Sequence, residues 1–290
     1  MDKIYENAWA KLNISLDVLS RLDDGYHAML MVMQSCEFRD DLEITLTKDG
    51  SFRTDSNVSY IPNDERNLVI KAAKEFFAAV GETKYGADIK IEKRIPVCAG
   101  LGGGSSDAAA VLRALNTLTG AGLDADRLRE IGMPIGADVP FCVEGGTSIA
   151  EGKGEILTPL PDLPDCHIVI CKPDFAISTP MLFGQIDCDK PRNRPDTDGL
   201  IEALAENNLS AVAKRMYNVF EDVLPKRFLE VGAVRRKLLH YEALGAAMSG
   251  TGSAVFGLFD DLDKAQYAYE QLQAEYSATF LTRPSRKVAV

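Results

Sequence analysis

A glycine-rich loop that leads directly into a helix is the clearest chemical signal in the sequence. The loop Gly100–Ser106 precedes residues 108–118, where apolar residues recur on one helical face, and Gly120 supplies a stop. We expect Ser105 or Ser106 to cap this helix. Glycines let the backbone approach an anion closely, and a helix N-terminus offers unpaired N–H groups with a partial positive charge. The loop therefore predicts a phosphate-binding site.

The common nucleotide-binding and hydrolase motifs do not account for this loop. No Gly-Lys-Ser/Thr follows it, which excludes a Walker A motif, and Asp107 stands where a dinucleotide fingerprint has its third glycine. Residues 174–176 read Asp-Phe-Ala, so the Asp-Phe-Gly of protein kinases is missing, and no Gly-x-Ser-x-Gly occurs to support a serine hydrolase.

Two N-terminal segments carry polar groups at regular spacing. Residues 10–16 alternate apolar and polar side chains, which predicts a strand with Lys11 and Asn13 on its polar face. The turn that follows presents an aromatic ring and an imidazole, those of Tyr26 and His27. Taken alone, the first segment is better explained by a solvated strand face and the second by an ordinary surface turn.

Two later segments have chemical groups at turns. Gly136–Phe141 places Asp138 among apolar neighbours, where it could accept a proton from a hydroxyl, although a turn-forming aspartate explains it equally well. Ser249–Ser253 combines three hydroxyl side chains with two glycines before the apolar run 254–259. A tight turn explains these glycines, and a wall near bound phosphates would also explain the hydroxyls.

The remaining pattern indicates two α+β domains joined near residue 160. Alternation predicts strands at 42–46 and 89–91, and four-residue steps predict a helix over 68–80 that ends at Gly81. Three prolines within 158–164 indicate a linker. Beyond it the pattern predicts strands at 168–170, 254–259 and 278–282 and helices around 199–222 and 226–242.

Composition narrows the classes of partner. The net charge of −11 disfavours nucleic acid and anionic membranes as partners, and no apolar run approaches the roughly 20 residues of a membrane span. The six cysteines form no Cys-x-x-Cys pair, and with only three histidines a structural zinc site is not expected. We expect a cytoplasmic protein with mostly buried, reduced thiols.

Together and in order, these segments resemble the GHMP kinase superfamily, which includes galactokinase, homoserine kinase and mevalonate kinase. Pro96–Ala110 is similar to its central motif, and the finer pattern resembles the family of 4-diphosphocytidyl-2-C-methyl-D-erythritol kinases. The segments that carry this finer resemblance are Ala10–Asn13, Asp24–His27, Asn67-Leu68, Gly136–Phe141, Gly152–Glu155 and Ser249–Ser253. One departure is Lys153, which stands between two glycines where an apolar residue is more usual.

The resemblance implies an α+β, two-domain GHMP kinase fold. Residues 1–158 would form the N-terminal ATP-binding domain, similar to the second domain of ribosomal protein S5. Residues 159–290 would form a C-terminal α/β sandwich, with the site between the two domains.

The resemblance also implies the reaction, which is transfer of the γ-phosphoryl group of ATP to the 2-hydroxyl of a cytidyl diphosphate sugar alcohol. Lys11 and Asp138 would be catalytic, with Asp138 as general base and Lys11 as its partner. The residues implied for ATP are Asn67, Leu68, Lys93, Pro96, Gly100, Leu101, Gly102, Gly103, Gly104, Ser105 and Ser106. Those implied for the cytidyl substrate are Asn13, Tyr26, His27, Thr179, Pro180 and Phe183.

Mg²⁺ would bridge the ATP oxygens, with no protein ligand evident beyond a hydroxyl of Ser105 or Ser106. The expected partners are these small molecules, without nucleic acid or membrane, and the chain would be a monomer or a weak homodimer. Two alternatives stay open: another GHMP kinase that acts on a homoserine- or mevalonate-type alcohol, and a non-catalytic nucleotide-binding protein.

Overall fold

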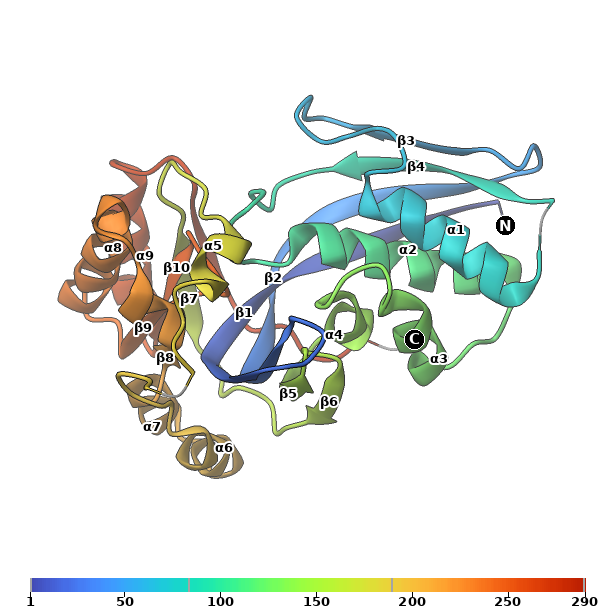
Figure 1. The fold of residues 1–290 in the computed structure, drawn as a ribbon. Helices are drawn as coiled ribbons and strands as arrows, with labels where there is room; N and C mark the ends of the chain where they lie inside the picture. The colour runs from blue at the N-terminus through green and yellow to red at the C-terminus, as the bar shows by residue number, and fades with distance from the viewer. Residues whose placement is uncertain (1, 83, 189, 289) are drawn as a thin grey trace.

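Two sheets, each with its own helices, build the molecule (Figure 1). The computed structural model describes residues 2–82, 84–188, 190–288 and 290. The larger sheet has the order β3-β4-β2-β1-β8; β5 pairs with the first half of β2, and β6 pairs with β5. The smaller sheet has the order β11-β7-β10-β9.

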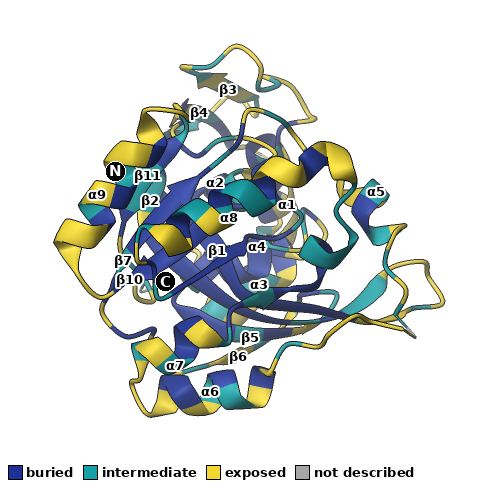
Figure 2. Ribbon diagram, turned by 90° about the vertical axis from the view of Figure 1, so that its left-hand side faces the viewer, coloured by how far each residue is buried: buried dark blue, intermediate teal, exposed yellow. Residues whose placement is uncertain are grey.

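The larger sheet is carried by two long antiparallel strands, β1 and β2. Its strands are β1 (Lys3–Arg21), β2 (His27–Thr47), β3 (Phe52–Ser56), β4 (Gly86–Glu92), β5 (Thr147–Gly152), β6 (Ile156–Pro159) and β8 (Tyr217–Asn218). The helices that follow these strands are α1 (Leu68–Val80), α2 (Gly103–Thr119), α3 (Ala125–Gly132) and α4 (Val139–Glu144). Figure 2 shows buried strands in the interior of the molecule and helices with exposed outer faces around them, whereas β3 lies partly exposed at an edge.

The smaller sheet and the helices beside it come from the second half of the chain. Its strands are β7 (His167–Cys171), β9 (Gly245–Met248), β10 (Val255–Phe259) and β11 (Thr279–Thr282). The helices are α5 (Thr179–Phe183), α6 (Thr197–Ala205), α7 (Leu209–Lys214), α8 (Leu229–His240) and α9 (Leu262–Gln273), with 3₁₀ turns at Val219–Val223 and Lys226–Phe228. Among the described residues no helix is long and apolar enough to cross a membrane.

The two halves of the chain interlock. The short strand β8 pairs in parallel with β1, although it follows the smaller sheet's first strand in sequence. After β11 the chain returns to β2, where the Ser285 amide donates to the Ser35 carbonyl oxygen at 2.9 Å. The domain boundary at residues 158/159 stays a prediction. Two segments after it, β8 and the stretch at Ser285, pack back on the larger sheet.

Most predicted elements are present, and two local expectations are wrong. The helix after the glycine-rich loop begins at Gly103, so neither Ser105 nor Ser106 caps it; Gly102 is the N-cap residue in a left-handed conformation. The predicted helix over 199–222 is divided into α6, α7 and β8, because Asn208 caps a new helix and Asn218 pairs with β1. The thiols are mostly buried, as expected: Cys36, Cys142, Cys166 and Cys171 are buried, and Cys98 is exposed.

The polar face of β1 is also buried, which excludes the solvated strand face. Residues 10–18 are all buried, because α2 packs on β1 and residues of the smaller sheet pack on its apolar side chains at 10, 12 and 14. Shifts in the β1–β2 register on both sides of Lys11 and Asn13 bend the strand at this point. Polar groups therefore enter the interior where the two halves meet.

The buried guanidinium of Arg113 ties α2 to β1 and α4. It donates to the carbonyl oxygens of Asn7 at 2.7 Å and Cys142 at 2.9 Å, and it pairs with the Glu6 carboxylate at 3.1 Å. The guanidinium carbon, Cζ, lies 5.7 Å from the centroid of the Trp9 ring. These contacts hold the helix that carries the glycine-rich loop against the strand that carries Lys11.

We predict that Arg113→Met lowers the free energy of unfolding by roughly 2–4 kcal/mol, because the carbonyl oxygens of Asn7 and Cys142 lose their buried donor. Urea unfolding measures the loss, with Arg66→Met as a control because the Arg66 side chain is 77% exposed. Equal effects of the two substitutions would contradict this role for Arg113.

Candidate active site

The glycine-rich loop is held by backbone contacts on two sides. Gly100 and Gly102 have φ angles of 79° and 67°, in the left-handed region that favours glycine. A Cβ atom on Gly100 would lie 2.0 Å from the carbonyl oxygen of Ser249, and one on Gly102 would lie 2.7 Å from Cγ of Lys11. The Lys11 amide donates to the Leu101 carbonyl oxygen at 2.9 Å. The loop therefore fits only if these positions lack side chains.

The loop opens onto the first turn of α2 at the floor of a cavity of about 550 Å³. The first N–H groups of a helix have no partner within it, so this turn offers donors and a partial positive charge to an anion. The side chain of Ser105 lines the cavity, whereas the Ser106 hydroxyl is buried and donates to the Trp9 carbonyl oxygen at 2.7 Å. The geometry suits a bound phosphate chain.

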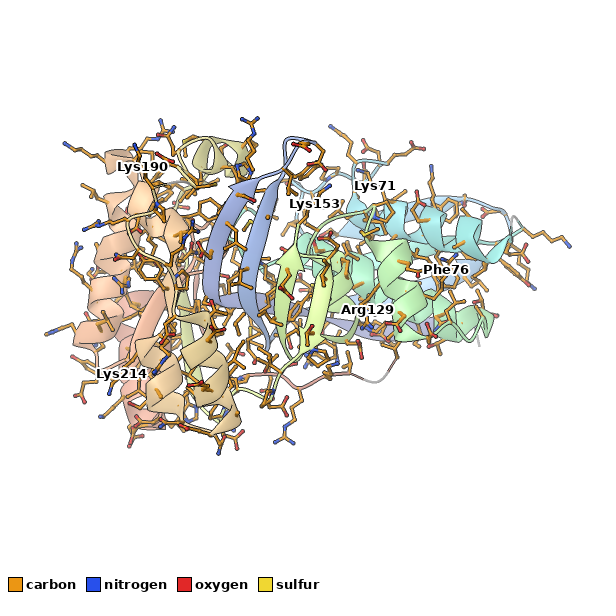
Figure 3. The ribbon with its side chains drawn as sticks, turned by 60° about the horizontal axis from the view of Figure 1, so that its bottom comes forward. Lys71, Phe76, Arg129, Lys153, Lys190 and Lys214 are labelled. Atoms are coloured by element: carbon orange, nitrogen blue, oxygen red, sulfur yellow. The ribbon has the colours of Figure 1, made fainter. Side chains whose placement is uncertain are left out.

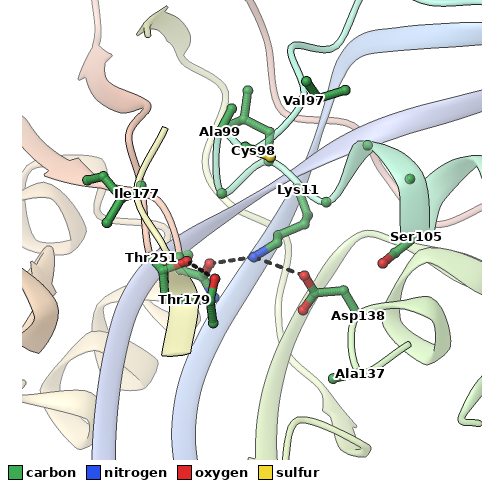
Figure 4. Close-up of a pocket in the computed structure, with 18 of the residues that line it drawn as sticks. Lys11, Val97, Cys98, Ala99, Ser105, Ala137, Asp138, Ile177, Thr179 and Thr251 are labelled. Atoms are coloured by element: carbon green, nitrogen blue, oxygen red, sulfur yellow. Dashed lines mark hydrogen bonds and ion pairs between the residues drawn. The ribbon is translucent and has the colours of Figure 1, made fainter. Parts of the chain in front are cut away.

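Lys11 joins two groups at the side of this cavity (Figure 4). Its Nζ lies 3.3 Å from Oδ2 of Asp138 and donates to Oδ1 of Asn13 at 2.8 Å. The Lys11 side chain is 5% exposed, whereas that of Asp138 is 31% exposed and is reached from the cavity. A buried cation thus orients a carboxylate that remains open to a substrate.

A second lysine near the loop is neutralised by two aspartates. The Nζ of Lys93 lies 2.5 Å from Oδ2 of Asp40 and 2.6 Å from Oδ2 of Asp107, and all three side chains are buried. Asp40 also accepts hydrogen bonds from the amides of Arg94 and Ile95. Because a Cβ on Gly103 would lie 3.0 Å from the Lys93 Nζ, the cluster sits directly against the loop and supports it.

The second glycine-rich turn closes the cavity from the smaller sheet's side. The Ser249 hydroxyl donates to the Gly100 carbonyl oxygen at 2.8 Å, and Asn218 fixes the turn by donating to the carbonyl oxygens of Met248 and Gly250. The hydroxyls of Thr179 and Thr251 lie 2.8 Å apart (Figure 4). The turn thus braces the loop, and of its three hydroxyl residues only Thr251 lines the cavity; Ser249 and Ser253 donate to the carbonyl oxygens of Gly100 and Phe175.

An aromatic cavity of about 1050 Å³ adjoins the first one. Tyr26, 63% exposed, and His27 lie at the β1–β2 turn, and Phe183 closes α5 opposite them. The His27 ring stacks on Phe183 with centroids 4.8 Å apart. Burial, helped by nearby Arg21, lowers the pKa of His27, so the imidazole is neutral at pH 7 and can both donate and accept a hydrogen bond.

The two cavities bring together most of the residues expected from the sequence. The ones that line the first cavity are Lys11, Asn13, Leu68, Lys93, Pro96, Gly100, Leu101, Gly102, Gly103, Gly104, Ser105, Asp138, Thr179 and Phe183. Tyr26, His27 and Pro180 line the second, together with Thr179 and Phe183. Asn67 lines neither of them: it caps α1 through the Val69 amide, and its side-chain nitrogen donates to the Pro62 carbonyl oxygen.

Several lining residues were not identified from the sequence. Met29, Met31 and Phe220 supply apolar walls, and Lys153 reaches both cavities. Their apolar or isolated positions carry no local signal of a site. The pairing of β2 with β5 brings the β5–β6 turn, and with it Lys153, close to the β1–β2 turn (Figure 3).

Comparison with known proteins agrees with the geometry of the site. The family described as GHMP kinases N terminal domain matches residues 67–146, and GHMP kinases C terminal matches residues 200–278. A mevalonate kinase of L. major and a homoserine kinase of Cytophaga hutchinsonii share the fold, with TM-scores of 0.75 and 0.76 at 16% and 19% identity. The matches define an α+β GHMP kinase fold, as expected.

More similar proteins narrow the family. A 4-diphosphocytidyl-2-C-methyl-D-erythritol kinase of Clostridium novyi (strain NT) is 44% identical over 280 residues, covering 97% of this chain and 99% of the relative. Another, of Alkaliphilus oremlandii (strain OhILAs), is 42% identical, covering 98% and 97%. A crystal structure of 4-(cytidine 5'-diphospho)-2C-methyl-D-erythritol kinase has a TM-score of 0.83 at 33% identity, covering 97% and 99%. The chain therefore belongs to the 4-diphosphocytidyl-2-C-methyl-D-erythritol kinase family of GHMP kinases.

The buried cluster beneath the loop predicts a pH-dependent stability. Burial raises the pKa of Asp107 from 3.8 to about 7, against the opposing effect of Lys93. The folded state thus holds the proton more tightly than the unfolded chain, so this stabilisation is complete below pH 4 and is lost as the pH rises through 7. We predict that the wild type loses stability relative to Asp107→Asn between pH 4 and pH 7. Urea unfolding across this range measures it, and a constant difference would contradict it.

Proposed function

We propose that the protein uses ATP to phosphorylate the 2-hydroxyl of 4-diphosphocytidyl-2-C-methyl-D-erythritol, the cytidyl substrate, with Asp138 as general base and Lys11 as its partner. The relatives named above support this substrate. The observation that carries the proposed mechanism is the Lys11–Asp138 pair, which faces the open end of the glycine-rich loop.

The proposed chemistry depends on positioning and charge. Phosphoryl transfer through a loose transition state needs an aligned acceptor and stabilisation of the charge on the transferred group. The loop amides and the N-terminus of α2 would hold the ATP phosphates. Asp138 would accept the proton of the acceptor hydroxyl, and Lys11 would orient the carboxylate. Asn13, which accepts from Lys11, would hold the lysine in this position.

The aromatic cavity supports a substrate that carries a base. Tyr26 offers an exposed ring face, Phe183 lines the cavity with the His27 ring stacked on it, and the neutral imidazole of His27 can bond to a base edge. A homoserine- or mevalonate-type acceptor has no ring to stack there. A non-catalytic role would leave the Lys11–Asp138 pair without a use.

Mg²⁺ is proposed as the accompanying ion, held mainly by the nucleotide. In the part of the chain that the structure describes, no group of three or more His, Cys, Asp or Glu side chains could hold a metal. This fits Mg²⁺, which keeps several waters and needs only one or two protein ligands beside phosphates. Ser105 is the loop hydroxyl that lines the cavity, whereas the Ser106 hydroxyl is already bonded to Trp9. When bound, the ion would neutralise charge on the phosphates.

The cytoplasm is the proposed site of action. The buried cysteines Cys36, Cys142, Cys166 and Cys171 are free thiols, which suits a reducing compartment where ATP is abundant.

We predict that Asp138→Asn lowers kcat by about 10²–10⁴-fold, because the amide cannot take the hydroxyl proton. ADP release with Mg-ATP and the cytidyl substrate measures turnover. Asp263→Asn, an exposed change in the first turn of α9, is the control. If Asp138→Asn keeps the turnover of the wild type, Asp138 is not the general base. Wild-type turnover with homoserine or mevalonate but not with the cytidyl substrate would refute the substrate.

We predict that Tyr26→Ala raises KM for the cytidyl substrate by roughly 5- to 150-fold, which corresponds to the loss of about 1–3 kcal/mol of stacking. KM for ATP should stay within about twofold, because Tyr26 lines only the aromatic cavity. Tyr60→Ala is the matched control, since Tyr60 is 64% exposed and lines neither cavity. An unchanged KM for the cytidyl substrate would exclude the stacking role.

A further inference from the structure

The two cavities share five lining residues, and we call this shared lining the seam. The residues that line both cavities are Met29, Ala137, Lys153, Thr179 and Phe183. Four of these side chains are uncharged, and Lys153 carries the single charge of the set. Anything that extends from the aromatic cavity to Asp138 must cross this seam and pass the Lys153 ammonium.

The backbone fixes Lys153 at the seam. It lies in the turn between β5 and β6, flanked by Gly152 and Gly154 with φ angles of 68° and 112°. Its amide donates to a Glu155 carboxylate oxygen at 2.5 Å. A Cβ on Gly154 would lie 3.8 Å from the Ala137 carbonyl oxygen, so the turn packs beside the segment that carries Asp138.

The side chain of Lys153 reaches back to the β1–β2 turn. Its Nζ lies 4.6 Å from the centroid of the Tyr26 ring and forms an ion pair with Asp24. Asp24 is itself held, because its Oδ1 accepts from the Tyr26 amide at 3.1 Å. The Lys153 side chain is 39% exposed, so its ammonium has room for a second anionic partner beside Asp24.

We infer that Lys153 binds the diphosphate of the substrate as that linker crosses the seam. This inference rests on the proposed function, which places the base against Tyr26 and the acceptor hydroxyl at Asp138. The linker then lies between them and carries negative charge at neutral pH. An ammonium group binds phosphate as a strong point-charge donor, and Lys153 is the cation that both cavities share.

Asp24 positions the Lys153 ammonium group for this contact and leaves it able to bind a second anion. The carboxylate is 49% exposed, so solvent weakens its attraction for the ammonium group. A diphosphate offers several charged oxygens, so it can share the ammonium group with Asp24. Lys153 therefore selects for the phosphates of the ligand, and Tyr26 selects for its base.

The test compares ligands that differ only in the phosphates. Calorimetry measures Kd for cytidine diphosphate and for cytidine with the wild type and with Lys153→Met, which keeps the length of the side chain and removes its charge. We expect the variant to bind cytidine diphosphate about tenfold or more weakly, because a charge-assisted bond is lost, while its Kd for cytidine stays within about twofold. Lys153→Arg should recover most of the affinity.

Two further variants separate this role from its alternatives. Lys71→Met, an exposed change on α1 outside both cavities, should leave both affinities unchanged (Figure 3). Asp24→Asn keeps the Oδ1 acceptor for the Tyr26 amide and removes the competing charge, so it should retain or improve binding of cytidine diphosphate. If the Asp24–Lys153 pair served only to hold the turn, Asp24→Asn and Lys153→Met would weaken both ligands alike, which would overturn the inference.

Turnover distinguishes a failure of this inference from a failure of the proposed function. If the wild type phosphorylates the cytidyl substrate and Lys153→Met binds cytidine diphosphate as tightly as the wild type does, the inference alone is wrong. If the wild type neither binds cytidine diphosphate nor phosphorylates the cytidyl substrate, the proposed function is wrong and the inference falls with it.

Discussion

Close contact between three stretches of backbone is the constraint on which the site depends. The loop at Gly100–Gly104 lies between the strand that carries Lys11 and the turn at Ser249, and the approach is too close for side chains at Gly100 and Gly102. The Ser249 hydroxyl and the Leu101 carbonyl oxygen complete the contact. Since these stretches are about 90 and 150 residues apart in the chain, the glycine-rich loop acquires its shape only when both halves of the protein have folded together.

Two lysines beside the loop have opposite roles because their partners differ. Lys93 is enclosed by Asp40 and Asp107, so both its ion pairs lie inside the protein, and the cluster packs against the loop. Lys11 faces a single, partly exposed carboxylate, that of Asp138, so the pair keeps an accessible oxygen for chemistry. Burial alone would not distinguish the two lysines; the number and exposure of their carboxylate partners does.

The fold class and the chemistry-bearing segments were predictable, because short motifs carry them. The alternation of apolar and polar residues predicted the strand at Lys11, and the composition of the glycine-rich loop predicted a phosphate site. Other features depend on contacts across the chain: the helix begins at Gly103 because the loop is braced by distant backbone, and Asp107 forms a buried ion pair with Lys93. Lys153 had no signal beyond its position between glycines, since only strand pairing brings it to the seam.

The residues proposed for catalysis and those proposed for binding the cytidyl group lie in different parts of this site. The Lys11–Asp138 pair and the loop are built on β1, α2 and the residue before α4, within the larger sheet and its helices. The walls of the aromatic cavity come instead from the β1–β2 turn, the β5–β6 turn and α5. Homoserine and mevalonate kinases share the fold at 19% and 16% identity, so the fold by itself does not determine the acceptor. Peripheral turns can change the acceptor while the phosphate loop and the acid–lysine pair stay in place, because no backbone of the central sheet has to move.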